Sequence, residues 1–181
     1  MPAWLADSLT LTRALLAPVL AVVLARGWLG PAAVLLSIAW LTDFADGRVA
    51  RAGRGPTRLG GFDLPADTLV GAGVLVGLAA GGFLPLPVAA AVLLVLGGGF
   101  LVLRNEALSM ALQAVGYGGF LWRLWTEGSA FVWSPVLTIA AIAVLDRRRF
   151  TRIVLPMFFG GVREALALRR GSGFRLPSDE P

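Results

Sequence analysis

Six apolar stretches, each close to the length that crosses a bilayer, take up most of this chain, and short breaks of glycine, proline or charged residues separate them. They cover residues 12–29, 31–50, 62–84, 86–104, 107–125 and 129–146. About 20 apolar residues are enough for a helix to span a bilayer, and a helix satisfies its own backbone hydrogen bonds there. The sequence therefore predicts an all-α, polytopic membrane protein with six transmembrane helices.

The two ends of the chain are less apolar than its middle. Residues 1–13 mix large apolar residues such as Trp4 with polar ones, which predicts an N-terminal segment that lies at the membrane interface. We expect residues 1–170 to form a single membrane domain, with 153–168 along the membrane surface. The last residues, 171–181, predict a disordered tail.

Positive charge is distributed unevenly between the breaks. All 16 basic residues are arginines, and the formal net charge is +5. The arginines gather after the second stretch (Arg48, Arg51, Arg54, Arg58) and after the sixth (Arg147, Arg148, Arg149, Arg152). Because basic loops stay in the cytosol, this pattern predicts a protein of the cell (inner) membrane with both termini on the cytoplasmic side. Arginines that punctuate apolar runs also argue against nucleic-acid binding, which needs a continuous basic surface.

The chain contains neither histidine nor cysteine. The commonest metal ligand and general base is therefore missing, and so is any thiolate site. A metal ion in this protein would have to be held by oxygen atoms. Oxygen ligands favour hard cations such as Mg²⁺, Mn²⁺ or Ca²⁺.

Four of the 11 acidic residues lie close together, at the end of the second stretch and the start of the third. On a helix, the spacing of the first group places its members on one face: Asp43, Asp46, Gly47, Ala50 and Arg51. Asp63 and Asp67, four residues apart, share a face of the next helix. Carboxylates facing one another repel strongly unless cations neutralise them, so the pattern favours a metal site. The alternative is that the acids only pair with Arg48, Arg51, Arg54 and Arg58.

The same residues carry a family resemblance. The pattern D-x2-D-G-x2-A-R-x8-G-x2-D-x3-D, from Asp43 through Gly60 to Asp67, resembles the signature of the CDP-alcohol phosphatidyltransferases. Leu9-Thr10-x2-Arg13, followed by Pro18, is similar to the first span of bacterial phosphatidylglycerophosphate synthases. The sequence departs from the family at one point. Gly60 precedes Asp63 by three residues, where the family has four.

The resemblance implies an enzyme of phospholipid biosynthesis, a phosphotransferase for substituted phosphate groups. It would transfer a phosphatidyl group from CDP-diacylglycerol to an alcohol and release CMP. By resemblance, two divalent cations, Mg²⁺ or Mn²⁺, are held by Asp43, Asp46, Asp63 and Asp67, and Asp67 also takes the proton of the attacking hydroxyl. The residues expected at the CDP moiety are Gly47, Ala50, Arg51 and Gly60. Homodimers surrounded by membrane lipids are usual in such a family.

The acceptor is a small alcohol or a phosphorylated alcohol. Arg58 and Arg104 are candidate ligands for an acceptor phosphate, such as that of glycerol 3-phosphate, because guanidinium binds phosphate well. Arg104 has an equally simple alternative role: it caps a helix end and adds to the positive charge on the cytosolic side. The chain also lacks the lysine-rich segment of the synthases, which weakens the glycerol 3-phosphate assignment.

Two other functions remain open at this point. The shortened Gly60–Asp63 spacing is also compatible with a catalytically degenerate family member that acts as a membrane scaffold or lipid-binding protein. An ion transporter that uses intramembrane carboxylates would distribute its acids through the membrane depth. The four aspartates instead cluster at one face.

Overall fold

A computed structural model of the chain describes residues 3–52 and 62–145, without the side chains of 3–6, 46–47 and 49–52. The chain divides into two compact units, residues 1–142 and 143–181. Only three residues of the second unit are described, so the structure below is that of the first. The predicted tail, 171–181, and the predicted surface segment, 153–168, lie outside the described residues.

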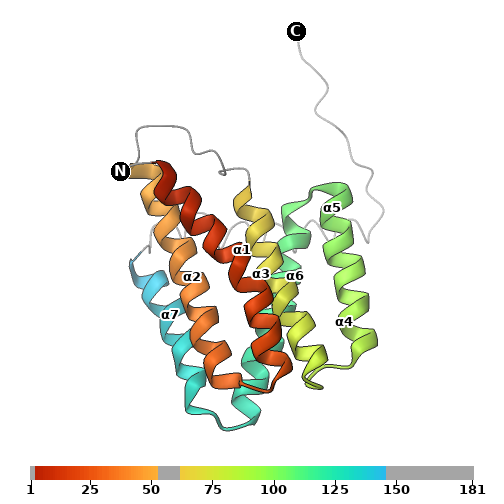
Figure 1. Cartoon of the computed structure of the whole chain (residues 1–181). Coiled ribbons are helices and arrows are strands. Elements are labelled where there is room, and N and C mark those ends of the chain that lie inside the picture. The colour runs from red at the N-terminus through yellow and green to blue at the C-terminus, as the bar shows by residue number, and fades with distance from the viewer. Residues whose placement is uncertain (1–2, 53–61, 146–181) are drawn as a thin grey trace. The chain divides into compact units, whose positions relative to one another are not determined.

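The described residues are almost entirely helical and contain no strand, which confirms the all-α prediction (Figure 1). In chain order the elements are α1 (Ala3–Ala25), α2 (Leu29–Ala52), α3 (Asp63–Ala80), α4 (Leu86–Val92), the π-helical turn η2 (Leu93–Gly98), α5 (Gly99–Leu103), α6 (Glu106–Thr126), the 3₁₀ turn η3 (Ala130–Val132) and α7 (Trp133–Leu145). Because α4, η2 and α5 follow one another without a break, each of the six predicted stretches forms one helical segment.

Three helical stretches are long and apolar enough to cross a membrane, residues 7–25, 63–80 and 86–103. Shorter apolar helices cover 29–45 and 130–145. Large apolar side chains also face outward; Leu94 and Leu101, for example, are each 75% exposed. An outer surface of this kind is suited to lipid contact, and it fits a membrane protein. The predicted interfacial segment at the N-terminus is continuous with the first span, since α1 begins at Ala3.

The chain reverses tightly between the fourth and fifth predicted stretches. Arg104 closes α5 in the left-handed conformation, with φ of 50°, where a non-glycine residue is uncommon. Asn105 then caps α6, because its side-chain oxygen accepts a hydrogen bond of 2.8 Å from the backbone N–H of Ala107. Two residues are therefore enough to reverse the chain.

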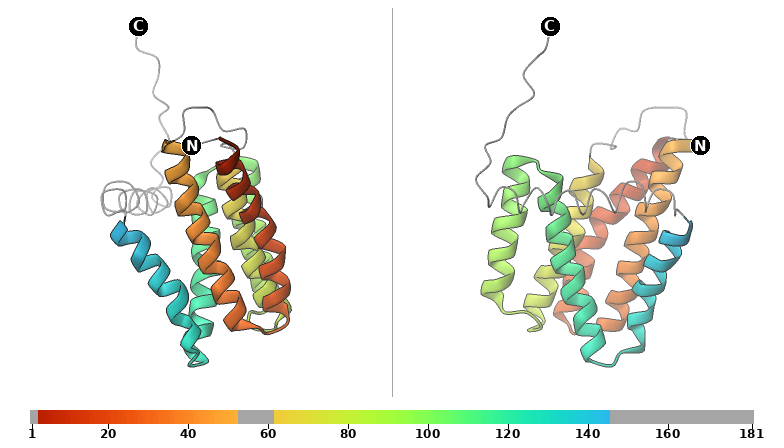
Figure 2. Two further views of the ribbon diagram at one scale, coloured as in Figure 1. Left: turned by 60° about the vertical axis from the view of Figure 1, so that its left-hand side comes forward. Right: turned by 180° about the vertical axis from the view of Figure 1, so that it is seen from behind.

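Glycines of α3 allow it to approach α1 very closely. A Cβ atom on Gly73 would lie 2.4 Å from the carbonyl oxygen of Ala17, and one on Gly77 would lie 2.6 Å from Cβ of Leu24. Small residues four apart are a common way to bring membrane helices together. The two helices lie side by side in all views (Figure 2), and this contact holds α1 and α3 together.

The opposite face of α3 packs against α6. A Cβ atom on Gly116 would lie 2.9 Å from the carbonyl oxygen of Gly71, so these backbones are also in close contact. Nearby, the hydroxyl groups of Thr68 and Ser109 lie 2.6 Å apart in the interior. The position of α3 is thus set on two sides, by α1 and by α6.

Candidate active site

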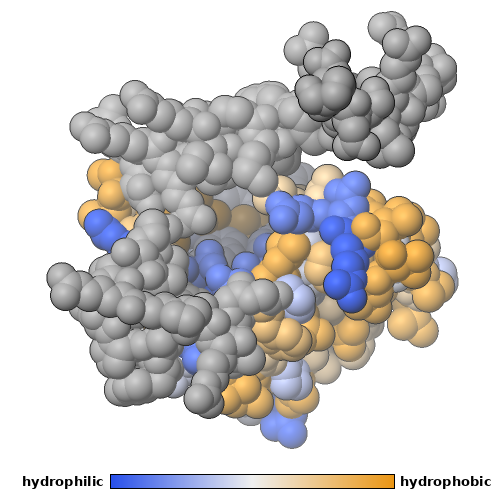
Figure 3. Space-filling view, turned by 90° about the horizontal axis from the view of Figure 1, so that it is seen from above, coloured by the Kyte–Doolittle hydropathy of each residue, from blue (hydrophilic) through white to orange (hydrophobic). Residues whose placement is uncertain are grey.

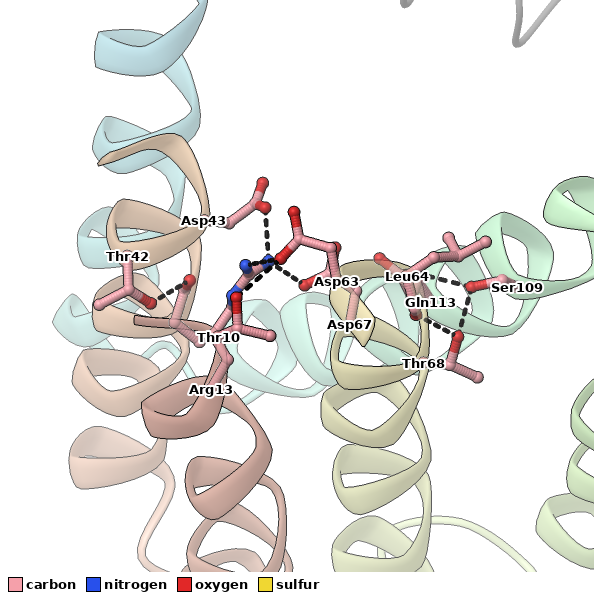
Figure 4. Close-up of polar contacts among 11 residues, drawn as sticks. Thr10, Arg13, Thr42, Asp43, Asp63, Leu64, Asp67, Thr68, Ser109 and Gln113 are labelled. Atoms are coloured by element: carbon pink, nitrogen blue, oxygen red, sulfur yellow. Dashed lines mark hydrogen bonds and ion pairs between the residues drawn. The ribbon is translucent and has the colours of Figure 1, made fainter. Parts of the chain in front are cut away.

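A buried arginine lies at the centre of the acidic cluster. Arg13 of α1 is only 1% exposed, and its Nη1 atom lies 2.5 Å from Oδ1 of Asp43 and 2.5 Å from Oδ1 of Asp67. Its Nη2 atom donates to Oδ1 of Asp63. Figure 4 shows the three carboxylates converging on this guanidinium. Charged hydrogen bonds of this kind are among the strongest in proteins.

The three acids come from two helices. Asp43 belongs to α2, whereas Asp63 opens α3 and Asp67 lies one turn later on the same face. The N-terminal position of Asp63 is favourable for a carboxylate, because the helix dipole is positive there. Thr10, one turn before Arg13, donates to Oδ1 of Asp63 at 3.2 Å. Residues of α1 therefore hold the first turn of α3 in place.

The cluster is open on one side and closed on the other. Asp43 is 52% exposed and Asp63 43%, whereas Asp67 is 26% exposed. Exposure thus falls from the outer carboxylates to the fully enclosed guanidinium. Seen from the end of the bundle where α3 begins, the described part of the surface exposes hydrophilic residues beside apolar ones (Figure 3). A polar or charged ligand can reach the carboxylates from this end.

A small cavity of about 40 Å³ adjoins Arg13, Asp43 and Asp67. Its other lining residues are Ala39, Trp40, Val70, Gln113 and Tyr117. This volume holds a water molecule or two and no larger ligand. A nucleotide or an alcohol substrate would therefore have to approach the acids from their exposed side.

Two further contacts make the surroundings of the cluster rigid. The rings of Trp40 and Tyr117 meet edge to face, with centroids 5.3 Å apart, and link α2 to α6. Gln113 donates to the hydroxyl oxygen of Ser109 at 3.1 Å, and that hydroxyl group contacts Thr68 of α3. Aromatic packing and a polar network thus position the helices that carry Asp43 and Asp67.

The structure brings together Asp43, Asp63 and Asp67 of the predicted site. The backbone of α2 includes four more predicted residues whose side chains are not described: Asp46, Gly47, Ala50 and Arg51. Arg58 and Gly60 lie outside the described residues. Arg104 is exposed in the α5–α6 turn. That turn lies at the same end of the bundle as the start of α3 (Figure 1).

The donor set is chemically suited to a divalent cation, since Asp43, Asp63 and Asp67 offer hard oxygen ligands. The arrangement of the three carboxylates, however, does not form a metal site. Within the part of the chain that is described, no three acidic side chains surround a point where an ion could sit. The carboxylates instead surround the guanidinium of Arg13. The cluster therefore fits a cation by chemistry, and in this conformation a side chain supplies the positive charge.

Arg13 and Thr10 did not emerge from the spacing of the acids as part of the site. The signal for Arg13 was present in the sequence. It lies within residues 12–29, the first predicted span, and an ionisable residue inside a span usually has a partner and a role. The partner itself was not predictable, because 30 to 54 residues separate Arg13 from the three acids.

Comparison with protein families gives a match over most of the chain. The family described as CDP-alcohol phosphatidyltransferase matches residues 3–157, which include every described acid of the cluster. Comparison with curated proteins and with solved structures gave no match.

Proposed function

Since the chain belongs to the CDP-alcohol phosphatidyltransferase family and is thus a phosphotransferase for substituted phosphate groups, we propose that it transfers a phosphatidyl group from CDP-diacylglycerol to an alcohol acceptor and releases CMP. The family implies a CDP-alcohol substrate, an alcohol acceptor and a role in phospholipid synthesis. CDP-diacylglycerol as the donor, the metal ions and the acceptor class belong to the proposal.

One observation carries the proposal. Asp43 of α2 and Asp63 and Asp67 of α3 converge at one end of the bundle, with the outer two carboxylates about half exposed. Acids that reach the end of a membrane bundle in this way are placed to meet a water-soluble headgroup, while the lipid tails stay beside apolar helices. The arrangement suits a reaction between a lipid-linked diphosphate and a polar acceptor.

The family generally uses divalent metal ions. We propose that Asp43, Asp46, Asp63 and Asp67 hold two of them, Mg²⁺ or Mn²⁺. Bound there, the cations would neutralise the diphosphate and make CMP a better leaving group. Gly47, Ala50, Arg51 and Gly60 would contact the CDP moiety, with small residues admitting the nucleotide close to the backbone.

Asp67 is the proposed general base. It is the least exposed of the three described acids, so the base and the acceptor hydroxyl would meet away from bulk water. The chain contains no histidine that could take this role. Loss of the hydroxyl proton to Asp67 would leave an alkoxide that attacks the phosphatidyl phosphorus.

We also propose a phosphorylated acceptor, such as glycerol 3-phosphate, with Arg58 and Arg104 at its phosphate. The active site and both termini would face the cytoplasm across the inner membrane, in line with the positive-inside distribution of arginines. A homodimer is the proposed oligomeric state.

The test is CMP release from CDP-diacylglycerol by the purified protein, with Mg²⁺ or Mn²⁺, across a panel of free and phosphorylated alcohols. The proposal predicts metal-dependent release that requires an acceptor, and lipid product that carries the acceptor. If no acceptor supports CMP release with either metal, the active-enzyme proposal is wrong. A catalytically degenerate member that binds lipid or acts as a scaffold would then explain the fold better.

A further inference from the structure

Arg13 is a buried charge that joins three helices. Its side chain comes from α1, and its described partners come from α2 and α3. A guanidinium withdrawn from water is unfavourable unless charged hydrogen bonds compensate it. The three carboxylates supply that compensation.

The arginine also stabilises the three carboxylates. Without a cation among them, Asp43, Asp63 and Asp67 would repel one another and drive apart the ends of α2 and α3. The guanidinium prevents this, because one group with several donors reaches all three carboxylates. A positive charge is therefore built into the cluster before any metal ion binds.

The surroundings of Arg13 offer its guanidinium group no alternative position. The adjoining cavity of about 40 Å³ is too small for a guanidinium group, and the side chain is 1% exposed. The carboxylates of Asp43 and Asp63, in contrast, are about half exposed. A metal ion would thus reach the carboxylates from the outside, with the arginine remaining behind them.

We propose that Arg13 is a built-in counter-ion of the aspartate cluster. In the metal-free protein it holds α2 and α3 in register, and it weakens the binding of divalent cations by the repulsion of its charge. The second part rests on the proposed function, in which the same aspartates bind metal. Arg13 is in this sense a positioning residue, which acts through the carboxylates and not on the substrate.

The experiment compares the full-length protein in detergent micelles with Arg13→Gln and, as a matched control, Arg26→Gln. Arg26 follows α1 about 20 Å further along the chain and stacks on Trp28. Thermal unfolding is followed in EDTA and in MnCl₂, and Mn²⁺ binding is measured by electron paramagnetic resonance. These readouts do not depend on activity.

In EDTA, Arg13→Gln should lower Tm by about 5 °C or more, whereas Arg26→Gln should leave it nearly unchanged. Mn²⁺ should raise the Tm of Arg13→Gln more than that of the wild type, and the variant should bind Mn²⁺ about tenfold more tightly. A purely structural arginine would lower Tm without increasing metal affinity.

An equal Tm for Arg13→Gln and Arg26→Gln in EDTA, or unchanged or weaker Mn²⁺ binding by Arg13→Gln, would overturn the inference. If Arg13→Gln does not fold, Arg13→Lys is tested in its place, because lysine keeps the positive charge but lacks the planar guanidinium group with its several donors. This variant should be less stable than the wild type in EDTA and should bind Mn²⁺ about as weakly as the wild type; wild-type stability in EDTA, or clearly tighter Mn²⁺ binding, contradicts the inference. Absence of Mn²⁺ binding by every variant would overturn the metal site of the proposed function, and the EDTA comparison would still test the counter-ion role.

Discussion

Gly73 of α3 lies against the backbone of Ala17 of α1, so closely that a Cβ atom on the glycine would be 2.4 Å from the alanine carbonyl oxygen. No rotamer change can relieve such a contact, because the backbone fixes the position of Cβ and the carbonyl oxygen is itself a backbone atom. The contact holds together the two helices that supply Arg13 and two of its carboxylates. The geometry of the site therefore depends on a position that carries no functional group.

Gly73→Ala is expected to destabilise the protein by about 1–3 kcal/mol, as overpacking of a close interface does. Thermal unfolding in detergent micelles measures the change. Gly118→Ala in α6 is the matched control, since nothing lies within 4 Å of a Cβ atom there. It should be neutral or stabilise the helix by up to about 1 kcal/mol. Equal effects of the two substitutions would show that the α1–α3 interface can accommodate a methyl group at position 73.

The hydroxyl pair between α3 and α6 should behave as a coupled unit. Ser109→Ala leaves Thr68 and Gln113 without their buried partner, which is expected to cost about 1–2 kcal/mol. Thr68→Val should have a similar effect. In the double variant the loss should be smaller than the sum of the two, because no unpaired hydroxyl group remains in the pair. Additive losses in thermal unfolding would contradict direct coupling.

Asp67→Asn is expected to reduce CMP release about 100-fold or more, because an amide cannot accept the acceptor proton. The variant also keeps the size of the side chain beside Arg13. Glu106→Gln, an equivalent change in the first turn of α6, should retain near wild-type turnover. Full activity of Asp67→Asn with the preferred acceptor would exclude the proposed base.

Arg104→Gln tests the acceptor assignment. With a phosphorylated acceptor, loss of a guanidinium–phosphate contact should raise KM for the acceptor about tenfold and change kcat little. KM for CDP-diacylglycerol should stay constant. Arg26→Gln provides the control for loss of one positive charge. If neither KM changes, Arg104 serves only the α5–α6 turn.

Removal of divalent metal should abolish turnover, and added Mg²⁺ or Mn²⁺ should restore it. The restored rate should be larger with these ions than with Ca²⁺, which prefers longer bonds and more ligands. CMP release in EDTA, before and after each ion is added, measures this directly. Turnover that persists in EDTA would rule out the proposed metal role.

Much of the fold was predictable because the bilayer imposes length and periodicity on each span. The six stretches and the shared face of Asp63 and Asp67 both follow from local patterns. The π-helical turn at Leu93–Gly98 did not, since nothing in an apolar run with glycines indicates where one residue is added to a turn.

The site was predictable only in part, for a related reason. Spacing within a helix places acids on a face, but it does not say which distant helix that face meets. Arg13 was visible as a charge inside a span, and its partners depend on how α1 packs against α2 and α3. That packing is set by glycines such as Gly73 and Gly77, whose contacts appear only in three dimensions.

The burial of Arg13 also has a consequence for how the protein is made. Synthesis delivers α1 to the membrane before α3, while Asp63 and Asp67 are still to be translated. An arginine at the centre of an isolated span raises the free energy of insertion by about 2.5–3.5 kcal/mol, and one nearer the end of a span, as Arg13 is, raises it by less. The first helix should therefore become more stable in the bilayer once the third helix lies beside it. Asp63 and Asp67 would then both complete the proposed active site and stabilise the first helix in the bilayer.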